Sequence, residues 1–128
     1  MGIRTKRVYE PATEDDGLRV LVDRYWPRGL RKEGAKVDLH LTGLAPSGAL
    51  RRWFDHDPAL FERFRSRYVE ELERNERPEL GDLVERARTG PVTLLFVARD
   101  VEHNNAVVLA DLLRQRLRLV LDRPGGGR

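Results

Sequence analysis

The sequence predicts a single three-layer α/β domain, with a mainly parallel, Rossmann-like sheet flanked by helices. Strand-like and helix-like segments alternate along the chain, which is typical of this class. The most apolar segment, residues 92–98, is a short continuous run without charge, as expected for a strand covered on both faces. Neither a repeat nor a linker divides the 128 residues, and this length is typical of one domain.

Two strand-like segments open the chain. Residues 3–9 alternate between polar and apolar side chains until Pro11 and the polar residues 13–17 end the pattern. Residues 18–22 predict a second strand, which Pro27 cannot continue because proline has no N–H to donate. A crossover between adjacent parallel strands usually needs a dozen or more residues. The shorter connection here favours a hairpin or a non-adjacent pair.

The middle of the chain predicts one loop, one short strand and one short helix. Residues 30–36 are mostly polar and predict a surface loop. Residues 37–42 alternate between apolar and polar side chains, which indicates a half-exposed strand. Ser47 precedes the apolar Trp53 and Phe54 at a spacing that makes it a candidate N-cap for a helix.

Two further helices have clear start and stop signals. Asp57 is an N-cap candidate followed by Pro58, and large apolar side chains then recur every three or four residues as far as Leu72. Pro78 opens the next helix, and the glycine and proline at 90–91 close it.

The last helix follows the apolar strand and is expected to begin with Asp100 as its cap. Its buried stripe is expected to comprise Ala106, Leu109, Ala110, Leu113 and Leu117. Residues 117–121 either prolong this helix or form an edge strand. The domain is therefore expected to span residues 1–121, with residues 122–128 as a flexible tail.

The composition narrows the possible functions. The chain has no cysteine, which excludes disulfides, thiolate catalysis and cysteine zinc sites. No stretch is long and apolar enough to span a membrane, so a soluble cytoplasmic protein is expected. The 24 basic and 21 acidic residues leave a charge of +3, too slight to imply nucleic acid. Of the 24, 21 are arginines, which suit carboxylate or phosphate recognition but also follow from codon bias.

Two of the predicted strands end in charged segments, residues 22–29 and residues 99–105. If these strands are parallel neighbours, both segments open on the edge of the sheet where ligands bind in open α/β folds. The free N–H groups of the helix that follows would also favour an anion there. The candidate ligand-binding residues are Asp23, Arg24, Trp26, Arg28, Arg99 and Asn104.

Each candidate has a functional and a structural interpretation. The arginines could clamp an anion beside a wall formed by Trp26, or they could make ion pairs around a tryptophan that caps the core. His103 is the candidate catalytic residue, because an imidazole exchanges protons near neutral pH. It could equally help to close the helix start, three residues after Asp100. No metal site is predicted, and no motif identifies a cofactor.

The order and spacing of seven motifs resemble the YeaO-like branch of the DUF488 family, whose function is unknown. The motifs lie at residues 6–9, 16–17, 22–29, 45–47, 53–54, 56–58 and 102–104. This resemblance implies that the strands at 3–8 and 18–22 are parallel and joined by a compact turn or helix.

The chain departs from the family at four positions. The broader family carries a Cys-His-Arg run where this chain has Asn104, Asn105 and Ala106, and YeaO-like members often have a histidine at the position of Asn105. A tryptophan frequent in the family is replaced by His40. The resemblance therefore does not extend to a cysteine-based or two-histidine mechanism.

Two functions follow from this reasoning. In the first, the protein binds a small anionic metabolite at the sheet edge and either processes it or only holds it, so the sequence leaves open whether it is an enzyme. In the second, it is a non-catalytic interaction module whose basic edge and residues 31–36 contact nucleic acid or an acidic partner. The missing nucleic-acid motif and the near-balanced charge count against the second.

Overall fold

The computed structural model describes residues 2–75 and 77–122. Its centre is a four-stranded sheet in the order β1-β4-β2-β3, with parallel pairing throughout. The strands are β1 (Gly2–Arg7), β2 (Leu18–Leu21), β3 (Leu39–His40) and β4 (Pro91–Phe96). The helices are α1 (Lys32–Ala35), α2 (Gly48–Phe54), α3 (Phe61–Arg74), α4 (Pro78–Thr89) and α5 (Asn105–Leu121). The predicted class, α/β with a parallel sheet flanked by helices, is therefore confirmed.

The first two strands are parallel but not adjacent, because β4 lies between them. Ile3 of β1 and Leu18 of β2 both pair with Val92, from opposite sides of β4. The link between the strands contains only one short 3-10 turn, η1 (Glu14–Asp16). The compact parallel connection implied by the family resemblance is thus confirmed. Of the two alternatives that the length of the link favoured, the non-adjacent pair is confirmed and the hairpin is wrong.

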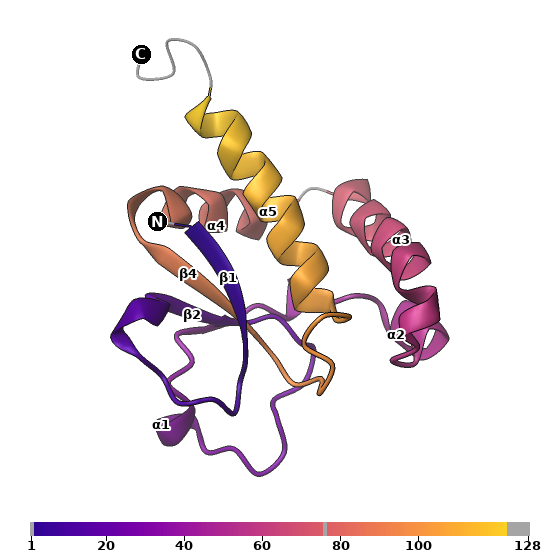
Figure 1. The fold of residues 1–128 in the computed structure, drawn as a ribbon, viewed down its shortest axis with the longest axis horizontal. Helices are drawn as coiled ribbons and strands as arrows, with labels where there is room; N and C mark the ends of the chain where they lie inside the picture. The colour runs from indigo at the N-terminus through magenta and orange to yellow at the C-terminus, as the bar shows by residue number, and fades with distance from the viewer. Residues whose placement is uncertain (1, 76, 123–128) are drawn as a thin grey trace.

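Figure 1 shows α3, α4 and α5 gathered on one side of the strands, with α1 apart from them on the other side. The predicted caps hold at two helix starts. Ser47 accepts a hydrogen bond from the N–H of Leu50 at 3.1 Å and so caps α2. Asp57 caps the 3-10 turn η3 (Pro58–Leu60) that leads into α3. Each cap satisfies a backbone donor that the helix itself leaves without a partner.

The core has two parts, one on each face of the sheet. In the larger part, Val92, Leu94 and Phe96 of β4 pack with the apolar sides of α3, α4 and α5. In the smaller part, Leu95 packs with Leu21 under side chains from the segment after β2. Residues 92–96 are at most 1% exposed, so β4 is the central strand buried on both faces that its apolar run predicts. The predicted strand of 92–98 ends two residues early, at Phe96.

Polar groups fill the rest of the second face around Asp16, which is 1% exposed. Its carboxylate accepts hydrogen bonds from Arg19 at 2.6 Å and from Lys6 at 3.0 Å. Burial raises the pKa of Asp16, but the hydrogen bonds from Thr13, Lys6 and Arg19 outweigh this effect and hold the pKa well below its ordinary value. Gly17 is required beside it, since its φ is +61° and a side chain would collide with the backbone of Pro91.

The last helix and the segment before β3 differ in part from the predictions. Residues 117–121 continue α5, and the predicted loop at 30–36 contains α1, whose Ala35 is buried. The expectation that Asp100 caps the last helix is wrong, because Asn104 occupies that position and accepts from the N–H of Val107. Of the predicted tail, residues 123–128 lie outside the described residues.

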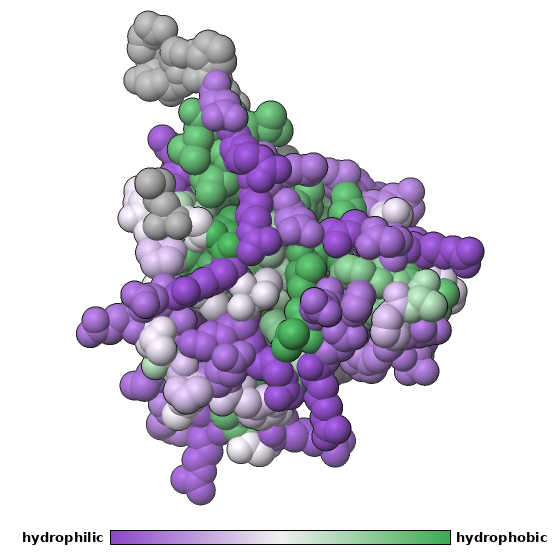
Figure 2. All heavy atoms as spheres, in the orientation of Figure 1, coloured by the Kyte–Doolittle hydropathy of each residue, from purple (hydrophilic) through white to green (hydrophobic). Residues whose placement is uncertain are grey.

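The surface is mostly hydrophilic in Figure 2, with apolar side chains gathered along α5. Leu119 and Leu121 near the end of that helix are 71% and 53% exposed. None of the helices in the described ranges has the length and apolar character needed to cross a membrane.

Candidate functional site

A pocket of about 990 Å³ lies at the carboxyl edge of the sheet. Its lining comes from the ends of β1, β2 and β4 and from α2, α3 and the start of α5. Because β2 and β4 are parallel neighbours, the charged segments that follow them open on the same edge, as the sequence predicts. The lining residues are Arg7, Tyr9, residues 23–28, Pro46, Arg51, Arg52, residues 54–56, Phe64, residues 97–100, Asn104 and Asn105.

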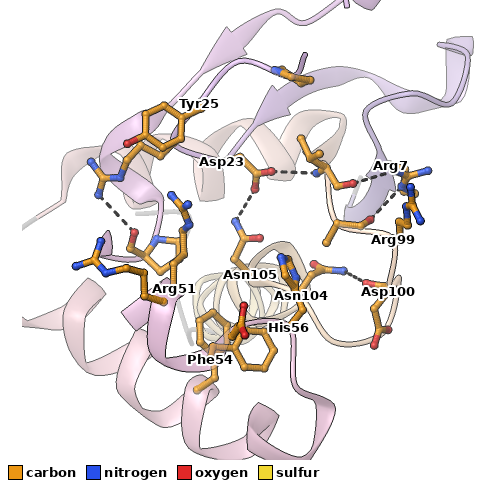
Figure 3. A pocket seen from close by; sticks show the side chains of 18 of the residues that line it. Arg7, Asp23, Tyr25, Arg51, Phe54, His56, Arg99, Asp100, Asn104 and Asn105 are labelled. Carbon is orange, nitrogen blue, oxygen red and sulfur yellow. Dashed lines mark hydrogen bonds between the residues drawn. The ribbon is translucent and has the colours of Figure 1, made fainter. Parts of the chain in front are cut away.

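Asp23 joins three elements at the floor of this pocket, as the dashed lines of Figure 3 show. One carboxylate oxygen accepts from the backbone N–H of Val97 at 3.0 Å, and the other accepts from the side-chain amide of Asn105 at 2.9 Å. Burial raises the pKa of Asp23, against the hydrogen bonds from Asn105 and Val97 and the positive charges of Arg51 and His40. Asp23 therefore braces the ends of β2, β4 and α5, and its carboxyl takes up a proton more readily than an ordinary aspartate does.

Arg7 and Asp100 hold the segment between β4 and α5 in place. The guanidinium of Arg7 donates to the carbonyl oxygens of Val97 at 2.9 Å and Ala98 at 3.0 Å. Asp100 accepts from the backbone N–H groups of Glu102 and His103, which, with the His103 ring, lower the pKa of its carboxyl. These contacts give the pocket a preformed wall.

The side chain of His103 lies outside the pocket lining. Its Nδ1 is 2.9 Å from the carboxylate of Asp100, and its ring stands edge-on to Phe61 with centroids 5.1 Å apart. Asn104 is 2% exposed and donates to the carbonyl of Asp100 while it caps α5. The predicted catalytic role of His103 stays a prediction, and the contacts of this residue are those of the structural alternative.

Positive charge dominates the lining, which contains six arginines and three aspartates. The arginines are Arg7, Arg24, Arg28, Arg51, Arg52 and Arg99. Among residues 2–75 and 77–122, no carboxylate lies within ion-pair distance of any of these six guanidinium groups. The structural alternative, in which the candidate arginines make ion pairs, therefore finds no support in this part of the chain.

Two aromatic side chains stand beside these arginines in different ways. Trp26 is half-buried, because its indole N–H donates to the carbonyl of Leu30 at 2.7 Å and its ring packs edge-on against His40. Tyr25 is 67% exposed, and the guanidinium of Arg51 lies over its ring at 5.4 Å. Trp26 is thus an anchored ring of the lining, and Tyr25 is an open one.

The six predicted ligand-binding residues all line the pocket. Sequence reasoning missed Arg7, Arg51, Arg52 and Asn105. Arg7 is the last residue of β1, and a first strand parallel to the others ends at the same edge of the sheet. The place of Arg7 could therefore have been predicted from the sequence. The position of Arg51 and Arg52 could not, because it depends on how α2 packs across the end of the sheet.

Three comparisons relate the chain to known proteins. The family model described as "Inactive DUF488-N3 subclade" matches residues 2–123. The uncharacterized protein Rv3073c of Mycobacterium tuberculosis is 45% identical over 114 residues, which are 89% of this chain and 95% of the relative. The uncharacterized protein YeaO of Escherichia coli is 42% identical over 114 residues, 89% of this chain and 98% of the relative. No solved structure is significantly similar to the chain.

Proposed function

This chain belongs to the YeaO-like DUF488 family, in the subclade described as inactive, and we propose that it binds a small anionic ligand in the arginine-lined pocket without transforming it. The description of the subclade as inactive supports binding over turnover. The composition agrees with that reading, since the chain has no cysteine to act as a nucleophile. His103 contacts Asp100 and Phe61 and does not itself line the pocket, so the proposal gives it no role.

The observation that carries the proposal is the unpaired positive charge of the pocket. Several arginines on α3, α4 and α5 have carboxylate partners, as in Arg65 with Asp111 at 2.9 Å and Arg88 with Glu85 at 3.1 Å. The six arginines of the pocket have no such partner in the described residues. A phosphate or carboxylate would supply it through charge-assisted hydrogen bonds.

The size and place of the pocket also support a small ligand. A volume of about 990 Å³ is at the upper end of the range of about 300–1,000 Å³ that is common for small-molecule sites. The pocket lies where ligands bind in open α/β sheets, outside the carboxyl ends of the strands. Its floor is rigidly braced by Asp23 and Arg7, so little ordering would be needed on binding.

The proposal is tested by removing one arginine from each of the two segments. Calorimetric titration with phosphate at constant ionic strength should show that Arg24→Ala and Arg99→Ala each weaken binding by about 1.5–3 kcal/mol, because a charge-assisted contact is lost. Arg63→Ala is the matched control, since Arg63 is exposed on α3 and outside the pocket.

Three results would contradict the proposal. One is equal affinity in all three variants, and another is the absence of binding to phosphate and to small carboxylates. The third is binding only to oligonucleotides, with an affinity that falls steeply with salt, which would favour the interaction-module alternative.

A further inference from the structure

Tyr25 is an aromatic ring left open to solvent inside a pocket rich in arginine. Its side chain is 67% exposed, although aromatic rings usually bury most of their surface. Among the described residues, the exposed large side chains that carry an aromatic ring are Tyr25 and Tyr9, and both line the pocket. The open aromatic surface of the chain is thus concentrated at one place.

Each tyrosine has an arginine over one face of its ring. The guanidinium of Arg51 lies 5.4 Å from the ring centroid of Tyr25, and that of Arg7 lies 5.1 Å from the centroid of Tyr9. Figure 3 shows Tyr25 and Arg51 on one side of the pocket and Arg7 on the opposite side. Because Arg51 covers one face of a ring that is still two-thirds exposed, the other face of Tyr25 is open to a ligand.

The other aromatic side chains of the lining are less suited to this contact. Trp26 is half-buried, and its ring is already held by an edge-on contact with His40 and by the hydrogen bond from its N–H to the carbonyl of Leu30. Tyr9 is 44% exposed, and its hydroxyl is directed to the carbonyl oxygen of Arg28. Tyr25 is therefore the ring on which a flat ligand group would stack.

We propose that the ligand is a phosphate ester joined to a flat heteroaromatic ring, as in a nucleoside monophosphate, with its ring on Tyr25 and its phosphate among the arginines. This inference rests on the proposed function and adds the ring to it. Base stacking on an aromatic side chain is tolerant of base identity, since every base has a π-face. The pocket is accordingly expected to accept different bases with similar affinity.

The same chemistry occurs in a free nucleotide and in a single-stranded nucleic acid. The experiment therefore compares four probes by calorimetry at fixed salt: ribose 5-phosphate, AMP, adenosine and a short single-stranded oligonucleotide. Stacking by one base corresponds to a factor of about 5 to 150 in affinity. We expect AMP to bind at least about 5-fold more tightly than ribose 5-phosphate, and adenosine to bind weakly because it lacks the phosphate.

Two substitutions of Tyr25 isolate the contribution of the ring. Tyr25→Ala should lower the affinity for AMP to that for ribose 5-phosphate and leave ribose 5-phosphate unaffected. Tyr25→Phe keeps the aromatic face and should keep the preference for AMP. Since Tyr25 is exposed, both variants should unfold at the urea concentration of the unsubstituted protein, which checks that the fold is intact.

The outcomes separate this inference from the proposed function. If AMP and ribose 5-phosphate bind equally, the inference is overturned while anion binding stands. If no phosphate-bearing probe binds, both are overturned. If only the oligonucleotide binds, both the proposed function and this inference are overturned in favour of the interaction-module alternative.

Discussion

Asp23 combines two roles that usually conflict in a binding pocket. It braces the pocket through Val97 and Asn105, and its carboxylate places negative charge beside arginines that are proposed to hold an anion. Burial raises its pKa, so mild acid neutralises it before an ordinary aspartate. The charge of the pocket therefore depends on the protonation of this residue.

Anion binding should consequently tighten as the pH falls. Sulfate is the suitable probe because its charge does not change in the range concerned. As the pH falls from about 7 towards the ordinary range of an aspartate, protonation of Asp23 removes one negative charge, and sulfate affinity measured by calorimetry should rise. The comparison with Asp23→Asn isolates the carboxyl from every other group that changes charge with pH. An identical pH profile in both proteins would show that Asp23 does not take part.

Trp26 should report the occupancy of the pocket. Its ring lines the pocket, whereas Trp53 lies outside it under the guanidinium of Arg67 at 4.1 Å. Fluorescence should therefore change when phosphate is added to the unsubstituted protein and to Trp53→Phe, and it should not change in Trp26→Phe. A response that persists in Trp26→Phe would place the anion elsewhere.

At the scale of elements, β4 is the part on which the others depend. It pairs with β1 on one side and β2 on the other, and both of its faces are buried. Its end also fixes the pocket, since Val97 donates to Asp23. Damage to the core at β4 should therefore reduce stability strongly.

Leu95→Ala tests this dependence. Leu95 is fully buried in the smaller core part, where its removal would leave a cavity, so the free energy of unfolding should fall by about 2–5 kcal/mol. Leu119→Ala is the control, because Leu119 is 71% exposed and its loss should cost no more than about 0.5 kcal/mol. Urea unfolding of the two variants measures the difference, and a loss well under 1 kcal/mol for Leu95→Ala would contradict a central position.

The elements were predictable where a local signal decides them. The uninterrupted apolar run predicted β4, and Ser47 and Asp57 predicted the starts of helices. The side chains of the segment between β4 and α5 were not predictable in the same way. Asp100 accepts hydrogen bonds from the N–H groups of Glu102 and His103, and the His103 ring packs against Phe61. The position of His103 after a strand end therefore predicted which segment it lies in, but not the direction of its side chain. The pairing of Arg19 with Asp16 was not predictable either, because their segments have the sequence pattern of an ordinary turn and an ordinary strand.

For the whole molecule, the buried cluster around Asp16 ties stability to pH. The folded protein lowers the pKa of Asp16, so its contribution to stability is complete above the unfolded pKa, near 3.8, and is lost as the pH falls towards the folded pKa. The cluster joins β1, the η1 turn and β2 through Lys6 and Arg19. Acid should therefore weaken the packing of the N-terminal half.

Asp16→Asn should remove this contribution. Arg19, whose side chain is 4% exposed, would lose its charged partner, and the free energy of unfolding at neutral pH should fall by about 3–5 kcal/mol. The variant should also lose less stability than the unsubstituted protein between about pH 5 and pH 2. Urea unfolding as a function of pH measures both effects, and parallel pH profiles would contradict the assignment.

The central claim is that the pocket at the carboxyl edge binds a small anion. Its most direct test is to follow the backbone amide signals of the protein by NMR during a phosphate titration at constant ionic strength. The account predicts saturable shifts concentrated in residues 23–28, 51–56 and 97–105, with little change along α3 and α4. Shifts that do not saturate, or that are spread evenly over the basic surface, would contradict it.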